Sequence, residues 1–412
     1  MTGDCQARFR EKGGGSPSPY STVYERMKIA YFSYLPIADV DFSYLHEAQK
    51  IMDITCYMLI LPNHINRSVI NFHTLFEKNG VFEALDCPEL ACYKDFLNLN
   101  KIKVINIANV GCWQIEAFRL LWNLSSKLKA EYDIIHLTRL PQWFEIPFFK
   151  FKKKAILSVH DPIPHSGQSL KARLLSNSAR RITYSLLNNF VIFNERQKES
   201  FISTYKLYNK NIIISRLSCY TCLQPIARQL SYKTDYKYIL FSGRITQYKG
   251  LQYLLPAFKK VHELYPSIKL IVAGSGKFSF DIEEYIKLDY IEIRHRFIPD
   301  TELIDLIKGS LFMVCPYTDA TQSGVIMSAF AFNVPVLATN VGGLPEMVKD
   351  RFFGRIIEER NEFALVEGIC EMLADEKQLK LYSDNIKTEY GEGNRSWKRI
   401  AEKLKMDYKS CI

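Results

Sequence analysis

The chain has 412 residues, of which 47% are hydrophobic, and it carries a net charge of +10. This length is too great for one hydrophobic core and predicts two domains of ordinary size, whereas no apolar run approaches the roughly 20 residues of a membrane-spanning helix. The positive charge favours a polyanionic partner, which leaves a nucleic acid, an anionic membrane surface or a phosphorylated substrate open.

Residues 1–26 differ in composition from everything that follows. Their glycine, serine and proline residues disfavour a regular element, and they lack the apolar segment of a secretion signal. We therefore expect a disordered tail. Met27, which opens the first apolar run, is expected to be the physiological start.

Between residues 27 and 220, apolar runs of strand length alternate with helical patterns. The predicted strands are 28–34, 55–61, 104–107, 133–137, 155–159, 189–193 and 212–215, and the predicted helices include 113–129 and 169–187. Strands that alternate with helices indicate a parallel, doubly wound sheet. We therefore expect an N-terminal Rossmann-like domain over residues 27–220, followed by a linker over residues 221–236.

One segment of this first domain combines aromatic and basic residues. Residues 141–149, PQWFEIPFF, lead into Lys150 and Lys152–Lys154. The segment is either a solvated loop before a strand or an interfacial patch whose lysines attract anionic lipid head groups. In the second case, the side chains that would dip toward the acyl boundary are Trp143, Phe144, Phe148 and Phe149.

After residue 236, three predicted strands end in glycine-rich or polar turns. The strands, each with its turn, are 238–242 with 243–250, 269–273 with 274–276, and 311–315 with 316–324. Helices are expected at 251–265 and 325–332, and a further strand at 336–338. In an open α/β sheet, ligands bind at the carboxyl ends of strands, where helix amino termini offer N–H groups to anions. We therefore expect a second Rossmann-like domain over 237–382, with a ligand site at these strand ends.

Four motifs in this second part resemble, in order and spacing, those of glycosyltransferase family 4, whose members are retaining enzymes of GT-B fold. They lie between Tyr238 and Glu346 and read GRITQYKGL, VAGSG, RFIPDTELIDLIKGSLFMVCPY and VPVLATNVGGLPE. The resemblance implies an α/β GT-B protein, in which two Rossmann-like domains face each other across a cleft and a C-terminal helix, here within 383–412, returns to the N-terminal domain. It implies transfer of a sugar from a nucleoside diphosphate sugar to a glycan or polyprenyl-linked acceptor, with no cofactor.

The resemblance also implies roles for particular residues. Cleavage of the anomeric C–O bond places negative charge on the departing diphosphate, which a fixed positive site stabilises more in the transition state than in the ground state. Arg244 and Lys249, expected as exposed cations at a strand end, would form that site, supported by N–H groups of Ser323–Val325. The residues expected to bind substrate are Gly243, Gly274, Gly276, Gln322, Ser323, Gly324, Val325, Ser328 and Glu346.

The segment Val159–Gly167, VHDPIPHSG, is expected to enter the cleft from the first domain, because family members place a histidine near the donor sugar. His160 is expected to be catalytic and His165 to bind substrate, since a neutral imidazole accepts from a sugar hydroxyl and a protonated one neutralises phosphate. Either histidine could instead be a structural hydrogen-bonding residue. Asp161 is expected to cap the loop.

The chain departs from the family in its acidic residues. Members commonly carry an E-x7-E motif that contacts the donor sugar and the ribose, and the corresponding positions here are Ala320 and Ser328. A hydrogen bond to a charged group contributes about 1.5–3 kcal/mol, so both losses must be compensated. Asp39 and Asp41 form a D-x-D tripeptide, which holds a divalent metal in some glycosyltransferases. Here we expect them to cap a helix and expect no metal.

Two interpretations of the missing acids remain. Either Gln322, Ser323 and Ser328 supply neutral hydrogen bonds, or the protein is a weakly active pseudoenzyme; we favour the first, because Arg244 and Lys249 would be idle in the second. A GT-B epimerase or hydrolase of sugar nucleotides would share the fold but should carry catalytic acids in the cleft motifs. A nucleic-acid binder would explain the charge but not the strand-end motifs, and no recognised nucleic-acid module is present.

The cysteines and one loop bear on location. The ten cysteines are scattered, and Cys219-x-x-Cys222 has no second pair at metal-ligand spacing, so we expect reduced thiols in a cytoplasm. The A-T-Q-S-G-V loop at 320–325 resembles loops of enzymes that build surface polysaccharides. We therefore expect a cytoplasmic enzyme of that kind, peripheral on the inner face of the plasma membrane if the aromatic and basic segment is interfacial.

Overall fold

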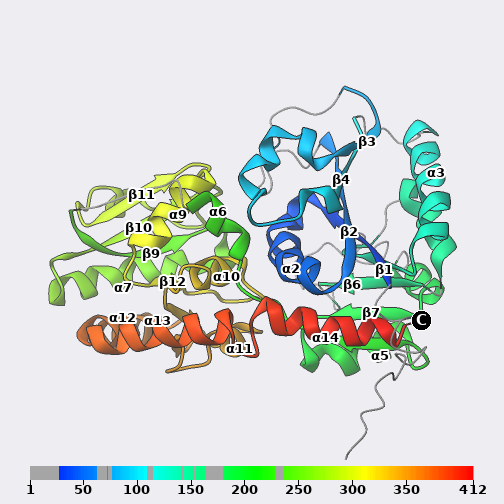
Figure 1. Ribbon diagram of the computed structural model, residues 1–412. Helices are drawn as coiled ribbons and strands as arrows, with labels where there is room; N and C mark the ends of the chain where they lie inside the picture. The colour runs from blue at the N-terminus through cyan, green and yellow to red at the C-terminus, as the bar shows by residue number, and fades with distance from the viewer. Residues whose placement is uncertain are drawn as a thin grey trace, which may run out of the picture.

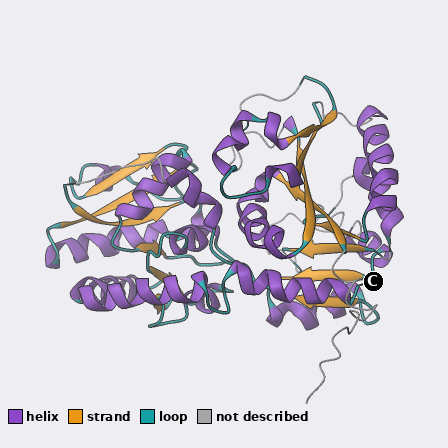
Figure 2. Ribbon diagram, in the orientation of Figure 1, coloured by secondary structure: helices purple, strands orange, loops and turns teal. Residues whose placement is uncertain are grey.

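Two parallel-stranded sheets form the framework of the protein (Figures 1 and 2). The computed structural model describes residues 27–62, 72, 77–108, 115–140, 143–152, 154–160, 162, 180–227 and 235–411. The predictions for the tail at 1–26, for Asp161 and for His165 therefore lie outside the described residues. Within them, an eight-stranded sheet comes from the first half of the chain and a six-stranded sheet from the second.

The N-terminal sheet has the strand order β3-β4-β2-β1-β5-β6-β7-β8. Its strands are β1 (Lys28–Tyr34), β2 (Asp53–Ile60), β3 (Gly80–Glu83), β4 (Ile102–Asn106), β5 (Ile134–Leu137), β6 (Ala155–Val159), β7 (Asn189–Ile192) and β8 (Asn211–Ile214). All neighbours pair in parallel except β3 with β4. Central strands of such a sheet are buried on both faces, which is why they appear in the sequence as continuous apolar runs.

Helices cover both faces of this sheet. Those of the first half are α2 (Ala38–Ile51), α3 (Ile115–Glu131) and α5 (Lys198–Tyr205), and the 3₁₀ helices include η4 (Pro88–Tyr93), η6 (Trp143–Phe151) and η8 (Thr221–Leu223). On one face, Tyr31 of β1 shares a core with α2 and with α14 (Trp397–Lys409) from the end of the chain. On the other face, Phe32 of β1 packs with α3, η6 and α5.

The C-terminal sheet has the order β11-β10-β9-β12-β13-β14, with every pair parallel. Its strands are β9 (Lys237–Ser242), β10 (Ile268–Gly274), β11 (Ile291–His295), β12 (Met313–Cys315), β13 (Val336–Thr339) and β14 (Gly354–Ile357). The helices are α6 (Gln224–Ala227), α7 (Leu251–Leu264), α8 (Glu283–Ile286), α9 (Asp300–Gly309), α10 (Gly324–Phe330), α11 (Leu344–Val348), α12 (Glu362–Ala374) and α13 (Glu376–Gly391). Helices α7 and α12 cover one face, and α9, α10, α11 and α13 the other.

The predicted strands are present, and the strands within the described residues that the sequence did not predict are β3, β11 and β14. All three lie at an edge of a sheet. An edge strand is covered less completely, so it lacks the continuous apolar run that identifies a central strand. In β11, for example, Glu292 and Arg294 alternate with isoleucines and all lie partly exposed after Ile291.

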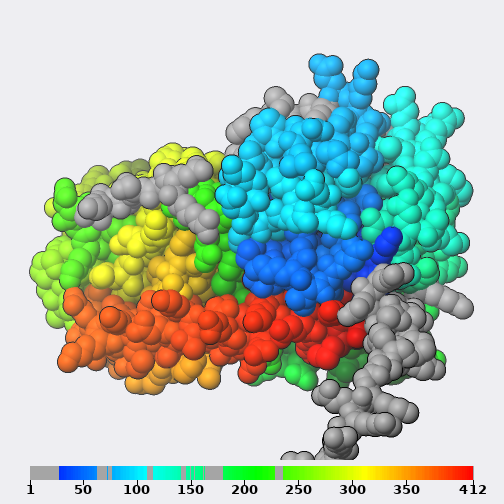
Figure 3. Space-filling model, viewed as in Figure 1, coloured from blue at the N-terminus to red at the C-terminus, as the bar shows by residue number. Residues whose placement is uncertain are grey.

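The C-terminal helix expected within 383–412 is not continuous, because the structure breaks this region into two helices, α13 and α14. Helix α13 ends at Gly391, and α14 begins after Ser396, whose hydroxyl accepts a hydrogen bond from the Arg399 N–H group. Tyr390 of α13 packs in the C-terminal core, whereas Tyr408 of α14 packs in the N-terminal core. Figure 3 shows the consequence: α13 and α14 form a continuous band along one side of both lobes. No helix among the described residues is long and apolar enough to cross a membrane.

Candidate active site

Four loops meet at one edge of the C-terminal sheet. Strands β10, β9, β12 and β13 are neighbours and run in parallel, so the turns that follow them share the carboxyl edge. This edge is where open α/β sheets bind ligands. The turns are 275–277, 243–250, 316–323 and 340–343.

Two glycines allow these loops to pack tightly. A Cβ atom on Gly250, which has φ of +76°, would lie 1.7 Å from the carbonyl oxygen of Pro316. A Cβ atom on Gly342, with φ of +51°, would lie 1.6 Å from the carbonyl oxygen of Ala320. Both positions combine left-handed backbone with close backbone approach, which glycine alone tolerates. The loop after β12 is thus clamped between the loops after β9 and β13.

Lys249 is nearly buried in this packing, contrary to the expectation of an exposed lysine. It ends the 3₁₀ turn η9 (Gln247–Lys249) and is 8% exposed. Its Nζ atom lies 3.6 Å from the ring centroid of Tyr317 and 5.5 Å from that of Tyr248. No carboxylate among the described residues lies within ion-pair distance of it. Desolvation therefore lowers the pKa of Lys249 to about 8.

Tyr317 offers the ammonium an aromatic face that is itself held in place. Its ring is fully buried, its hydroxyl accepts from the Ser323 hydroxyl at 3.4 Å, and its carbonyl accepts from the Thr339 hydroxyl at 2.6 Å. Burial raises the pKa of Tyr317 well above its usual value and raises the pKa of Cys315, next to it, to about 11. Neither group is an anion near neutral pH, so the Lys249 charge is not neutralised.

The loop from Gln322 to Ser328 contributes less than expected. Ser323 is buried and caps α10, because its hydroxyl accepts from the N–H group of Ile326. The Ser328 hydroxyl donates to the Gly324 carbonyl at 3.0 Å and is therefore engaged within its own helix. The Gln322 side chain forms no hydrogen bond with another described residue. Of the three predicted neutral substitutes, Gln322 is thus the one whose side chain is available to a ligand.

The other predicted C-terminal residues surround the same edge. A Cβ atom on Gly243 would lie 3.3 Å from the side chain of Val325, so the end of β9 adjoins the start of α10. Gly274 and Gly276 come into backbone contact with Gly243 and Ile245. Arg244 is exposed and forms no ion pair with another described residue. Glu346 is exposed in the first turn of α11, where its carbonyl accepts from Arg395.

His160 belongs to a different group of residues. It follows β6, and its ring stacks on that of Phe193 with the ring centroids 4.8 Å apart. It lines a cavity of about 20 Å³ together with Tyr31, Asp41, Tyr44, His136 and residues of α14. A cavity of this size holds about one water molecule. The structure thus brings Arg244 and Lys249 to one edge but places His160 against α14.

The same cavity contains His136, which the sequence did not single out, and Asp41, whose burial the sequence did not predict. His136 on β5 bonds to the Tyr408 hydroxyl at 2.6 Å and the Ser158 hydroxyl at 2.8 Å, and burial lowers its pKa to about 3. Asp41 accepts from the Tyr31 hydroxyl at 2.8 Å, and burial raises its pKa to about 7. The partners of His136 lie on α14 and β6, so no local sequence pattern marks this histidine.

The predicted helix-capping role of the D-x-D tripeptide is wrong for Asp41. The N-cap of α2 is Ile37, which makes no side-chain capping bond, and Asp41 points into the core. Among the described residues, no three His, Cys, Asp or Glu side chains are grouped so as to hold a metal ion.

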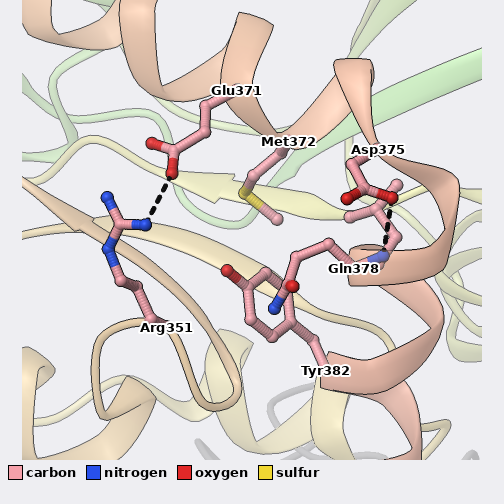
Figure 4. A pocket seen from close by; sticks show the side chains of 7 residues that line it. Arg351, Glu371, Met372, Asp375, Gln378 and Tyr382 are labelled. Carbon is pink, nitrogen blue, oxygen red and sulfur yellow. Dashed lines mark hydrogen bonds and ion pairs between the residues drawn. The ribbon is translucent and has the colours of Figure 1, made fainter.

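A larger cavity of about 310 Å³ is lined by Arg351, which precedes β14, and by residues of α12 and α13 (Figure 4). Arg351 pairs with Glu371 at 3.2 Å. Asp375 caps α13 by accepting from the N–H groups of Lys377 and Gln378. These polar groups stabilise the junction of α12 and α13, and they lie away from the strand ends that carry Lys249.

Comparison with known proteins agrees with this geometry. Residues 224–389 match the family described as glycosyl transferases group 1. The chain is 31% identical over 192 residues to an uncharacterized glycosyltransferase of Methanocaldococcus jannaschii, a match that covers 45% of this chain and 48% of that protein. The chain spans about half the length of the curated relatives it matches.

Two solved structures are similar over almost the whole chain. Sucrose-phosphate synthase from Thermosynechococcus elongatus has a TM-score of 0.61 and 18% identity, covering 93% of this chain and 99% of that one. Anabaena HepE in complex with UDP-glucose has a TM-score of 0.58 and 14% identity, covering 93% and 100%. Residues 224–389 are therefore similar to the glycosyl transferases group 1 family, and the chain has the GT-B fold that the motifs predicted. The domain limits at 220, 236 and 382 stay predictions.

Proposed function

We propose that the protein is a retaining glycosyltransferase of family 4, which moves a sugar from a nucleoside diphosphate sugar to a glycan or a polyprenyl-linked acceptor in surface polysaccharide synthesis. One observation carries the proposal: the ammonium of Lys249 is nearly buried at the carboxyl edge of the group 1 domain and has no carboxylate partner among the described residues. Such a charge costs stability in the free protein, which is characteristic of a functional site.

The aromatic partner of Lys249 suits an anionic ligand. A carboxylate would hold the ammonium but would also cancel its charge, whereas the face of Tyr317 attracts the cation and leaves the charge in place. A donor diphosphate would therefore meet a full positive charge in a poorly solvated site, where electrostatic interactions are stronger than in water. Arg244, exposed on the same loop, would add a second cation with a planar hydrogen-bonding fork.

The chemistry follows from where charge develops. The bond between the anomeric carbon and the β-phosphate oxygen breaks, and the electron pair stays on the departing diphosphate. Lys249 and Arg244 stabilise that charge more strongly in the transition state than in the ground state. The acceptor hydroxyl attacks the same face of the sugar, and its proton passes to the departing phosphate oxygen. This route requires no protein base. The acids missing at Ala320 and Ser328 would contact the donor, so their loss bears on donor binding and not on proton transfer.

Gln322 is the residue that we assign to the donor in place of the missing acids, since its amide is not engaged by another described residue. An amide offers both a donor and an acceptor to sugar hydroxyls. In this assignment Ser323 and Ser328 support the loop rather than touch the sugar, and Gly243, Gly274, Gly276, Gly324 and Val325 provide backbone close to the donor. Glu346 lies one loop further along the edge and would contact the nucleoside part.

UDP is the first nucleotide to test, because Anabaena HepE, which shares the fold, was solved with UDP-glucose. We place the enzyme in the cytoplasm, where its partners would be the donor and a lipid-linked acceptor at the inner face of the plasma membrane. The eight cysteines within the described residues are all free thiols, which accords with a reducing compartment.

The test is a thermal-shift screen of nucleoside diphosphates and their sugars, followed by an assay for free diphosphate released in the presence of acceptor. A ligand that binds the native state raises its melting temperature, so we expect one diphosphate to stabilise the wild-type protein. The Lys249→Ala variant should respond weakly, and a matched variant, Lys287→Ala in the exposed turn after α8, should respond like wild type. A wild-type protein that responds to no diphosphate would refute the proposal.

A further inference from the structure

Helix α3 has an outward face with exposed apolar side chains. Its inner face is buried through Ala117, Leu121 and Leu128, which pack toward the sheet. On the other side, Ile115 is 62% exposed and Trp122, two turns later, is 47% exposed. Figure 1 shows α3 on the side of the N-terminal sheet that faces away from the C-terminal sheet.

The neighbouring 3₁₀ helix η6 completes the surface. Ile146 is 52% exposed, and Lys150 places its Nζ atom 3.0 Å from the ring centroid of Trp122 and 3.4 Å from the Ser126 hydroxyl. Phe148, by contrast, is 1% exposed and packs in the core. The expectation that Phe148 would dip into a membrane is therefore wrong. Trp122, which the sequence did not single out, occupies the exposed position instead.

Charges around this surface are predominantly positive. The basic residues on α3, on η6 and in the turn after η6 are Arg119, Lys127, Lys129, Lys150, Lys152 and Lys154, against the exposed carboxylates Glu116 and Glu131. The third acidic residue, Glu145, is buried and paired with Arg139. Desolvation and then the nearby charge of Lys129 lower the pKa of Lys150, so these two cations repel each other, whereas Lys127 pairs with Glu131 at 4.0 Å.

We propose that the α3–η6 face, defined by Ile115, Trp122, Ile146 and the surrounding basic residues, docks on a bilayer that contains anionic lipid. Tryptophan is favoured at the boundary between head groups and acyl chains, because its ring is apolar and its N–H group is polar. Lysine and arginine side chains reach outward from apolar surfaces to lipid phosphates. We assign this face to lipid rather than to a protein partner. Its apolar side chains are separated from one another by cations, and a layer of lipid phosphates would neutralise those cations together.

This role deepens the proposed function, because a polyprenyl-linked acceptor lies in a membrane. The surface is nevertheless separate from the residues assigned to the donor, which lie on the C-terminal sheet. Docking through α3 would hold the N-terminal lobe, the expected acceptor side, at the bilayer. The donor site and the membrane-docking face can therefore be tested independently, the first by nucleotide binding and the second by vesicle binding.

The test is flotation of the full-length protein with vesicles of phosphatidylcholine alone or with added phosphatidylglycerol. We expect binding to the anionic vesicles, little binding to the neutral ones, and loss of binding as salt screens the surface charges. Trp122→Ser and Lys152→Glu should each weaken binding by about tenfold, because the first removes the interfacial ring and the second reverses one charge near the lipid.

Matched control variants distinguish specific binding through the α3–η6 face from non-specific binding of the protein to vesicles. Phe363→Ser removes an apolar side chain of α12 that is 75% exposed, and Lys287→Glu reverses an exposed charge in the C-terminal part. Both should bind like wild type, and all four variants should keep the nucleotide-induced rise in melting temperature. Equal binding to neutral and anionic vesicles would overturn the proposal, as would binding that Trp122→Ser and Lys152→Glu leave unchanged. Lys152→Glu lies in an exposed turn, so it remains informative even if Trp122→Ser fails to fold.

Discussion

Replacement of Lys249 by Met should stabilise the free protein while it impairs the donor site. The pKa of Lys249 falls from the ordinary 10.5 to about 8 because the ammonium is desolvated. At about 1.4 kcal/mol per pKa unit, this corresponds to roughly 3 kcal/mol of destabilisation by the buried charge. Methionine has a similar length and no charge, so Lys249→Met should recover up to about this amount at pH 7. An exposed lysine would instead contribute within about 0.5 kcal/mol.

The difference in unfolding free energy between Lys249→Met and wild type should depend on pH. Between pH 8 and 10.5 the unfolded chain keeps the Lys249 proton while the folded protein loses it, so wild-type stability rises with pH in this window. The advantage of Lys249→Met is therefore fully present below pH 8 and disappears as the pH approaches 10.5. Urea denaturation of both proteins at pH 7 and pH 10 measures it.

The same substitution should reduce catalysis. Removal of one preorganised group that stabilises developing charge costs about 10²–10³-fold in kcat, and the loss in kcat should exceed the rise in KM. Lys249→Arg should not restore activity fully, because a planar fork differs in reach from an ammonium. If Lys249→Met were less stable than wild type at pH 7 and released diphosphate at a normal rate, both the burial argument and the active-site assignment would be refuted.

Three further predictions concern the same site. Tyr317→Phe keeps the aromatic face and should bind the nucleotide nearly as wild type does, whereas Tyr317→Leu should bind about tenfold more weakly; calorimetric titration compares them, and equal affinities would contradict the cation–π assignment. Affinity for the diphosphate should change little between pH 7 and pH 8 and then weaken by up to about tenfold per pH unit, because the free site must regain a proton; a flat profile up to pH 9.5 would argue against contact with Lys249. Treatment with EDTA should lower turnover little, since Arg244 and Lys249 take the place of a cation, and rescue of a lost activity by magnesium or manganese would show the opposite.

The framework of the fold was predictable because central strands are buried on both faces. Strands such as β1 and β9 therefore show continuous apolar runs, and the alternation with helices indicated the parallel sheets. Edge strands β3, β11 and β14 carry polar and exposed side chains, so no such run marked them. The break between α13 and α14 arises because α13 packs against the C-terminal core and α14 against the N-terminal core. The helical periodicity of the sequence does not indicate which core a helix packs against.

The candidate site was predictable in position but not in environment. Motif order placed Lys249 and Arg244 at a strand end. The burial of Lys249 depends on Tyr317, a residue of a different strand end, and on close packing of Gly250 against Pro316. Likewise, Trp122 and Lys150 lie on separate helices, and the sequence alone did not indicate that one stacks on the other.

The crossing of α14 to the N-terminal sheet affects the order in which the protein can be completed during synthesis. Tyr408 on α14 bonds to His136 on β5, and Trp397 donates to the Cys219 carbonyl at 2.7 Å. The N-terminal core therefore lacks one covering helix until residues 397–409 have been synthesised. Domains generally fold as units during synthesis, N-terminal first, but here Leu404 and Ile400 must arrive before the N-terminal core is closed. Until then, the face of the N-terminal sheet that α14 covers is exposed and apolar. Chaperones that bind nascent chains would recognise such a face.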